Sequence, residues 1–161
     1  MLDKPQIVQI AAQLTAIIRL VILREEIQNV MGPGIAELMA ALATQGIAPT
    51  GPVFSHHLRM DPATFDFEIG VPVRASIFPM GRVKAGQLPA VTAARTLYHG
   101  PYEGLGPAWA EFDALIAAEG HTPAPDLWEC YVTGPESNPD QATWRTELNR
   151  PLRSLGTNSQ L

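Results

Sequence analysis

The residue whose side chain is best suited to chemistry is Glu129, a carboxylate inside an apolar, strand-like segment. Alternation along this segment places Glu129 and Tyr131 on one face, and Trp128 and Cys130 on the other. An ionised carboxylate in such a setting is costly to desolvate unless it is paired. An apolar pocket that left Glu129 unpaired would attract a cationic ligand. The alternatives are that Glu129 lies on a solvated face or pairs with an arginine such as Arg95.

Aromatic side chains near this segment could provide flat surfaces for an aromatic or cationic ligand. Stacking and cation–π contacts contribute ~0.5–2 kcal/mol each. The candidates are Tyr98, Tyr102, Trp109 and Tyr131. Trp109 also shares an apolar helical stripe with Phe112, so a core role is at least as well supported. Tyr102 follows a Gly-Pro turn that would project its ring outward, and its alternative role is a capping hydrogen bond.

The spacing of histidine and cysteine does not favour a metal site or a nucleophile. His56 and His57 are adjacent, so on a strand they point to opposite faces and cannot chelate one metal together. Neither His99 nor His121 has a second ligand at a suitable spacing. Cys130 has no obvious base beside it. With no phosphate-binding loop or nucleotide motif either, we predict no metal and no cofactor.

Composition limits the class of protein. The 161 residues carry a formal net charge of −5, and the 11 basic residues are scattered, which argues against direct binding of nucleic acid. One cysteine excludes an internal disulfide framework and fits a reducing compartment. The most apolar run, residues 14–23, contains Arg19 and is far shorter than the ~20 residues that span a bilayer. We therefore expect a cytoplasmic protein without membrane contact.

The sequence contains an internal repeat at an offset of 74 positions. The matching pairs are Gly32-Pro33 with Gly106-Pro107, Leu38 with Phe112, Leu42 with Ile116, Gly46 with Gly120, and Pro49 with Pro123. Their shared order predicts two copies of a β-α-β-β unit. The same offset aligns Ser55 with Glu129 and His57 with Tyr131, so we expect Ser55 and His57 to line the far wall of a ligand site. The alternative for His57 is a surface position.

Hydrophobic periodicity and turn residues predict the elements of each copy. In the first copy they are a strand at 14–23, a helix over 34–45 that begins near Pro33, and strands at 53–59 and 65–74 joined by an Asp61-Pro62 turn. In the second copy they are a strand at 91–99, a helix over 107–119, and strands at 127–133 and 143–148. Residues 79–90, rich in glycine and proline, are interpreted as the joint between the copies.

Four segments in this frame match a known family pattern. They are residues 67–73, 99–102, 129–131 and 146–152. On these segments the chain resembles the GyrI-like small-molecule-binding domain, which is also the effector-binding domain of certain AraC-type and MerR-type regulators. The resemblance covers 6–152 as a single domain, with repeat one at about 6–78, repeat two at about 90–152 and a C-terminal tail at 153–161.

The resemblance implies an α+β fold: a curved antiparallel sheet with two helices and a groove between them for hydrophobic, often cationic or aromatic compounds. It implies that Glu129 lies at the base of this pocket. The other ligand-binding candidates are Tyr131, Tyr98, Tyr102, Trp109, Ser55 and His57. Because no DNA-binding module is evident beside the domain, we expect a stand-alone form.

Three functions are compatible with this reading. The first is capture of a hydrophobic small molecule for sensing or sequestration, without catalysis. The second is hydrolysis of cyclopropanoid alkylating compounds, as in some stand-alone members of the family, with Glu129 as acid or base beside Tyr98 or Tyr131. The third is a gyrase-inhibitor-type module that binds a protein partner through its acidic surface.

Overall fold

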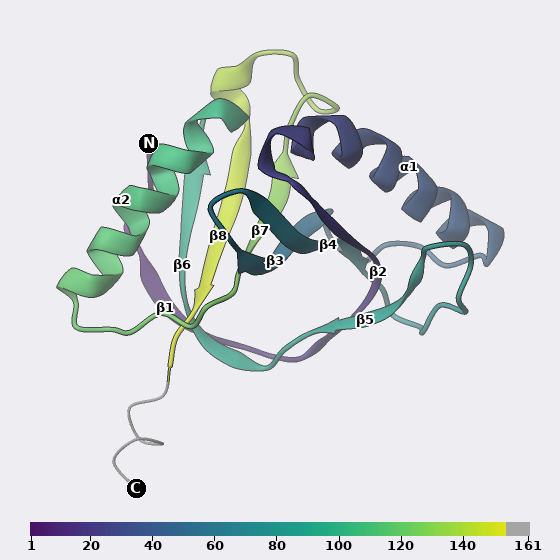
Figure 1. Cartoon of the computed structure of the whole chain (residues 1–161), viewed down its shortest axis with the longest axis horizontal. Helices are drawn as coiled ribbons and strands as arrows, with labels where there is room; N and C mark the ends of the chain where they lie inside the picture. The colour runs from purple at the N-terminus through teal and green to yellow at the C-terminus, as the bar shows by residue number, and fades with distance from the viewer. Residues whose placement is uncertain (154–161) are drawn as a thin grey trace, which may run out of the picture. The chain divides into compact units, whose positions relative to one another are not determined.

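The computed structural model describes residues 1–153. The chain divides into two compact units (Figure 1). We call Ala11–Pro89 the central unit, and Met1–Ile10 together with the chain from Ala90 onward the terminal unit. All but the first residue of the predicted 153–161 tail lies outside the described residues. No helix within residues 1–153 is long and apolar enough to cross a membrane.

The central unit contains four antiparallel strands and one long helix. The strands follow the order β3-β4-β2-β5. Their bounds are Gln13–Leu23 for β2, Phe54–Met60 for β3, Thr64–Pro72 for β4 and Lys84–Leu88 for β5, and helix α1 spans Ile27–Thr44. Alternation along β2 and β4 directs one set of side chains toward α1, so that Ile18 and Ile69 pack against Leu38 and Leu42 in the core.

A glycine sets how closely α1 approaches its sheet. Gly34 is buried, and a β-carbon at this position would lie 2.6 Å from the Cδ1 atom of Ile69. A larger side chain at this position would therefore require the end of the Ile69 side chain to move.

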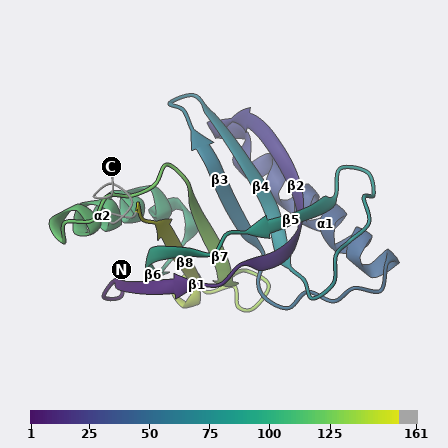
Figure 2. The same cartoon turned by 90° about the horizontal axis from the view of Figure 1, so that it is seen from below.

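The terminal unit has the same composition of elements. Its strands follow the order β1-β6-β8-β7. Their bounds are Gln6–Ile10 for β1, Val91–His99 for β6, Leu127–Thr133 for β7 and Arg145–Pro151 for β8, and helix α2 spans Leu105–Ala118. Phe112 and Ile116 of α2 are buried against Ala94, Tyr98 and Leu148 of the sheet. In both units the helix therefore lies along one face of its own sheet (Figure 2).

The predicted duplication is confirmed, because β2-α1-β3-β4 and β6-α2-β7-β8 have the same order and antiparallel pairing. The predicted α+β class is confirmed with it. Each unit also gains an edge strand that precedes the other copy in the sequence. Strand β1 pairs with β6, and β5 pairs with β2. The short strand that precedes each copy thus pairs with the first strand of the other copy.

This pairing corrects the interpretation of residues 79–90 as a joint, because Lys84–Leu88 is strand β5. Only Leu88 of β5 is buried, so the segment has almost no apolar alternation from which a strand could be recognised. Its backbone pairing with β2 is what makes it a strand.

The first helix also begins earlier than predicted, at Ile27 instead of near Pro33. Pro33 lies inside α1 on its exposed face. Both helices end as the glycines indicated, at Thr44 and Ala118, and Gly46 and Gly120 follow with φ of 68° and 82°.

Strand β8 begins at Arg145 instead of Thr143, because residues 141–143 form a 3-10 turn. The Asp140 carboxylate accepts a hydrogen bond from the Ala142 amide at 3.1 Å and caps this turn.

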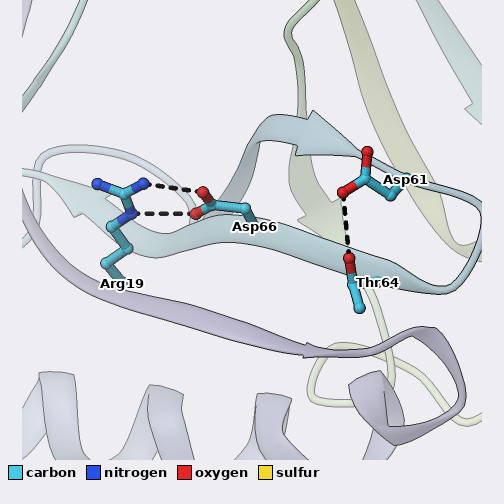
Figure 3. A network of polar contacts seen from close by, with 4 residues as sticks. All are labelled: Arg19, Asp61, Thr64 and Asp66. Carbon is cyan, nitrogen blue, oxygen red and sulfur yellow. Dashed lines mark hydrogen bonds and ion pairs between the residues drawn. The ribbon is translucent and has the colours of Figure 1, made fainter.

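Figure 3 shows the predicted Asp61 turn and a cross-strand ion pair beside it. The Asp61 amide donates to the Thr64 carbonyl at 3.1 Å, which joins β3 to β4. On the outer face, Arg19 of β2 donates from Nε and Nη2 to the two Asp66 oxygens, at 3.0 and 2.8 Å. This fork marks the register between β2 and β4, in which Leu20 faces Phe67 and Val21 faces Asp66.

Candidate functional site

Glu129 of β7 is buried, with 8% of its surface exposed, and both of its carboxylate oxygens accept hydrogen bonds. Trp109 Nε1 on α2 donates to Oε2 at 2.6 Å, and the Tyr131 hydroxyl donates to Oε1 at 2.8 Å. The expectation of an unpaired carboxylate is therefore wrong. The proposed partner Arg95 lies elsewhere, donating to Asn149 at 2.7 Å. Neither the indole nor the phenol donor carries a charge.

Two elements bring these three side chains together. Alternation along β7 directs Glu129 and Tyr131 to the side of the sheet on which α2 packs. Trp109 is partly buried on α2, and its ring contacts Phe112 with centroids 5.7 Å apart. The ring of Trp109 therefore packs on the core, while its N–H binds the carboxylate. Contact of Trp109 with a ligand stays a prediction.

A cluster of aromatic rings lies beside Glu129. Tyr102 packs edge-to-face on Tyr131 at 5.8 Å and tilts against Trp144 at 5.0 Å. Burial raises the pKa of the Tyr102 phenol, and the nearby carboxylates of Glu136 and Glu129 raise it further. The residues Glu129, Tyr131, Trp109, Tyr102 and Trp144 are called the Glu129 cluster below.

Sequence reasoning missed Trp144, which precedes β8 and donates from its indole N–H to the Asn138 carbonyl at 2.7 Å. It was not recognised because this segment was assigned to a strand, and no periodic signal marked it as part of an aromatic cluster.

Tyr98 has a structural role in the terminal unit. It is buried in the core of the terminal unit, and its hydroxyl donates to the Pro101 carbonyl at 2.9 Å. This bond fixes the turn between β6 and α2. The Tyr98 hydroxyl thus stabilises the backbone directly before Tyr102.

The opposite face of β7 carries Trp128 and Cys130, as the alternation predicted. Along that face, Asn149 of β8 donates to Glu147 at 3.1 Å and approaches the Cys130 sulfur at 3.9 Å. Burial, with a contribution from Glu147, raises the pKa of the Cys130 thiol to about 12. The thiolate needed for nucleophilic chemistry is therefore negligible at neutral pH.

Ser55 and His57 form a smaller polar pair in the central unit. Both are buried, and Ser55 Oγ lies 3.3 Å from His57 Nε2. The His57 ring stacks on Phe67 at 5.1 Å and meets Phe65 edge-on at 4.9 Å. Its alternative role as a surface histidine is therefore wrong. Burial, followed by the charges of His56 and Arg24, lowers the pKa of His57 to about 4, so the ring is neutral at pH 7.

The pair Ser55–His57 occupies the position in β3 that Glu129–Tyr131 occupies in β7, and each pair is joined by a hydrogen-bond contact. The repeat alignment thus identified equivalent positions. The groove implied by the family resemblance, and the contact of any of these residues with a ligand, stay predictions. Among the described residues, no group of three histidine, cysteine or acidic side chains could hold a metal ion.

We expect Tyr131→Phe to lower the free energy of unfolding by about 1.5 kcal/mol, because it removes a donor from a buried carboxylate. Tyr102→Phe is the matched control. Its hydroxyl makes no hydrogen bond to the described residues, so a change within about 0.5 kcal/mol is expected. Urea denaturation of the three proteins measures the difference. Equal losses in both variants would contradict the assigned role of the Tyr131 hydroxyl.

The sequence of residues 3–153 matches the model of one family, described as the GyrI-like small molecule binding domain. No curated protein matches the chain in sequence. Among solved structures, the EcmrR C-terminal domain superposes with a TM-score of 0.83 at 20% identity, covering 94% of this chain and 98% of that one. Against EcmrR in its DNA complex, this chain spans 58% of the length of the matched chain.

Two further similar structures are more distant. A hydrolase from Listeria innocua has a TM-score of 0.66 at 11% identity, covering 93% of this chain and 92% of that one. SAV2435 bound to tetraphenylphosphonium has a TM-score of 0.65 at 12% identity, covering 98% of this chain and 99% of that one. At these identities the likeness establishes the fold.

Proposed function

Because the chain belongs to the family of GyrI-like small-molecule-binding domains, we propose that it captures a hydrophobic aromatic cation at the Glu129 cluster. The observation that carries this proposal is the buried carboxylate held by one indole and one phenol donor beside two further aromatic rings. A carboxylate attracts the charge of such a ligand, and the rings offer surfaces for its aryl groups.

The two donors also explain how a carboxylate is kept inside an aromatic environment. Hydrogen bonds from Trp109 and Tyr131 offset part of its desolvation cost without supplying a positive charge themselves. A ligand cation close to Glu129 would therefore add an attraction that these two bonds do not provide. At ~4 Å and an effective dielectric of 20, Coulomb attraction amounts to about 4 kcal/mol before desolvation is subtracted.

The similar proteins support this class of ligand. SAV2435 has been solved with tetraphenylphosphonium, a cation with four phenyl rings. The C-terminal domain of EcmrR belongs to a protein that also has a DNA complex, which supports a role in sensing. We place the present chain among proteins that sense or sequester such compounds in the cytoplasm.

Titration of the wild-type chain with tetraphenylphosphonium tests the proposal. Binding should quench tryptophan fluorescence, because Trp109 and Trp144 both lie in the Glu129 cluster. Saturable quenching by the phosphonium, with weaker binding of the neutral compound triphenylphosphine oxide, is the expected result. Equal affinity for both compounds, or no binding of either, would contradict it.

A second candidate function is hydrolysis, which the similarity to a Listeria innocua hydrolase favours. The Tyr131 hydroxyl donates to Glu129 at 2.8 Å, so the two groups could act together as acid and base. Glu129 would take a proton from water as the water oxygen bonds to a ring carbon and the strained carbon–carbon bond breaks. Tyr131 would give its proton to the electron pair released from that bond and would then recover a proton from Glu129. Incubation with a cyclopropane-bearing alkylating compound distinguishes the two functions. Stoichiometric binding without product supports capture, whereas repeated turnover that Glu129→Gln abolishes supports hydrolysis.

A further inference from the structure

The loop between β7 and β8 brings a second carboxylate to the edge of the Glu129 cluster. The amides of Ser137 and Asn138 both donate to the Gly134 carbonyl, at 2.9 and 3.2 Å, so the chain folds into a tight turn directly after β7. Glu136 lies within this turn, and its side chain returns toward Gly134. Its Oε2 atom is 3.0 Å from the position that a β-carbon on Gly134 would occupy.

Tyr102 approaches the same glycine from the turn that precedes α2. A β-carbon on Gly134 would collide with the Tyr102 hydroxyl, so a larger residue there would require the ring to move. The Tyr102 hydroxyl and the Glu136 carboxylate therefore lie on the same side of Gly134. After burial, the carboxylates of Glu136 and Glu129 are the two causes that raise the pKa of this phenol, which places Tyr102 near both acids.

Trp144 fastens the turn to the aromatic rings of the cluster. Its indole N–H donates to the Asn138 carbonyl at 2.7 Å, and its ring packs on Tyr102 with centroids 5.0 Å apart. Glu136 is exposed, but the backbone that carries it is held at the edge of the cluster. Within residues 1–153 no arginine or lysine forms an ion pair with Glu136, so its carboxylate is accessible to a ligand cation.

A buried hydroxyl beside these rings has no hydrogen-bond partner. Thr146 of β8 has 0% of its surface exposed, and its Oγ1 atom forms no hydrogen bond within residues 1–153. Thr146 lies opposite Tyr131 in the strand pairing and two residues after Trp144, so its side chain points to the face on which both rings lie. A buried hydroxyl without a partner is costly, and an N–H group of a ligand packed against these rings would supply one.

From these observations we propose that the Glu129 cluster prefers aromatic compounds with two cationic groups, one of which is a protonated amine. The inference rests on the proposed function, because it assigns a second anchor to the same site. Glu129 attracts one charge inside the cluster, and Glu136 attracts the other at its exposed edge. A protonated amine carries N–H donors that a quaternary cation lacks, so it can form hydrogen bonds to carboxylate and hydroxyl oxygens.

The second anchor has a modest effect because Glu136 is exposed. An ion pair with an exposed carboxylate changes a binding constant by about fivefold at most. Salt screens such a pair, because the distance over which charges interact falls from about 10 Å in ~0.1 M salt to about 3 Å in ~1 M salt. The preference for a second cation is therefore expected to be largest at low ionic strength.

Two compounds of similar size and polarity test the proposal. Aminopropyl-triphenylphosphonium carries a phosphonium and an ammonium group, whereas hydroxypropyl-triphenylphosphonium has a neutral hydroxyl in place of the ammonium. Calorimetric titration at low salt should show roughly fivefold tighter binding of the amine to the wild-type chain. Glu136→Gln should bring the ratio of the two affinities close to one. Glu103→Gln removes an exposed charge next to Tyr102 in the sequence and should keep the wild-type ratio.

A third compound tests the nature of the second group. A trimethylammonium group in place of the amine keeps the charge but has no N–H donor, so this compound should bind more weakly than the amine. Equal or tighter binding of the trimethylammonium compound would overturn the assignment of a protonated amine.

The outcomes separate this inference from the proposed function. If the wild-type chain binds the amine and the alcohol equally, the second anchor is overturned and the proposed function stands. If the chain binds neither compound, both are overturned. A ratio that Glu136→Gln leaves unchanged, or that does not fall as salt is raised to about 1 M, would also overturn the second anchor.

Discussion

Acidification from pH 7 to pH 4 is expected to destabilise the wild-type chain by about 3 kcal/mol more than a His57→Gln variant. His57 has 4% of its surface exposed and packs against Phe67 and Phe65. This burial lowers its pKa from 6.5 to about 4. Protonation would place a cation between these rings, with Arg24 nearby.

The direction of the effect follows from proton binding in the two states. The unfolded chain protonates His57 near pH 6.5, whereas the folded chain resists protonation until about pH 4. Stability from the neutral imidazole is therefore fully present above pH 6.5 and is lost as the pH falls toward 4. Glu68 and Asp113 act in the opposite direction, because burial raises the pKa of each carboxyl in the folded chain.

Comparison with His57→Gln isolates the histidine, since the carboxyls are present in both proteins. Glutamine does not titrate and can still form a hydrogen bond with Ser55. Urea denaturation at half-unit steps between pH 4 and pH 7.5 gives the two stability curves. Parallel curves for wild type and His57→Gln would refute the assignment.

We expect the wild-type chain to bind a cationic ligand roughly thirtyfold more tightly than a neutral one, a difference of about 2 kcal/mol in binding free energy. Replacing Glu129 by glutamine is expected to remove this preference. The amide keeps the size of the side chain and one acceptor oxygen, so Trp109 or Tyr131 can still donate to it. The negative charge is lost. Affinity for tetraphenylphosphonium should fall toward that for triphenylphosphine oxide, while affinity for the neutral compound changes little.

Calorimetric titration of both compounds into wild type, Glu129→Gln and Glu111→Gln provides the measurement. Glu111 is exposed on α2, so its variant controls for a general loss of negative charge. Equal weakening of both compounds in Glu129→Gln would mean that Glu129 shapes the site without selecting charge. Unchanged binding together with loss of cyclopropanoid hydrolysis would favour the enzymatic function.

The repeat also indicates why the charged cluster is confined to one unit. The positions equivalent to Glu129, Tyr131 and Trp109 are occupied by Ser55, His57 and Ile35. Ile35 packs against the core of the central unit and has no N–H on its side chain to donate to a buried carboxylate. The duplicated fold thus offers two equivalent positions, of which one carries a buried acid and its two donors.

The sequence alone determined the features that depend on local periodicity. The bounds of β6 and β7 agree with the predicted ranges 91–99 and 127–133, because each is a run rich in apolar and aromatic residues between proline and glycine turn residues. The C-terminal ends of both helices could also be predicted from nearby sequence. Gly46 and Gly120 follow the helices and adopt a positive φ that other residues avoid. The face shared by Glu129 and Tyr131 followed from the two-residue period of a strand.

Only the tertiary structure decided which partners these residues have. Strand β5 has a single buried residue, Leu88, and its pairing with β2 joins segments about 70 positions apart, which no local pattern encodes. Trp109 donates to Glu129 because α2 packs on the face of the sheet to which Glu129 points. The Tyr98 hydroxyl donates to the Pro101 carbonyl, within the turn that follows β6. Hydrogen bonds between side chains on different elements depend on distances of a few ångströms set by packing, whereas sequence periodicity specifies only the face on which a side chain lies.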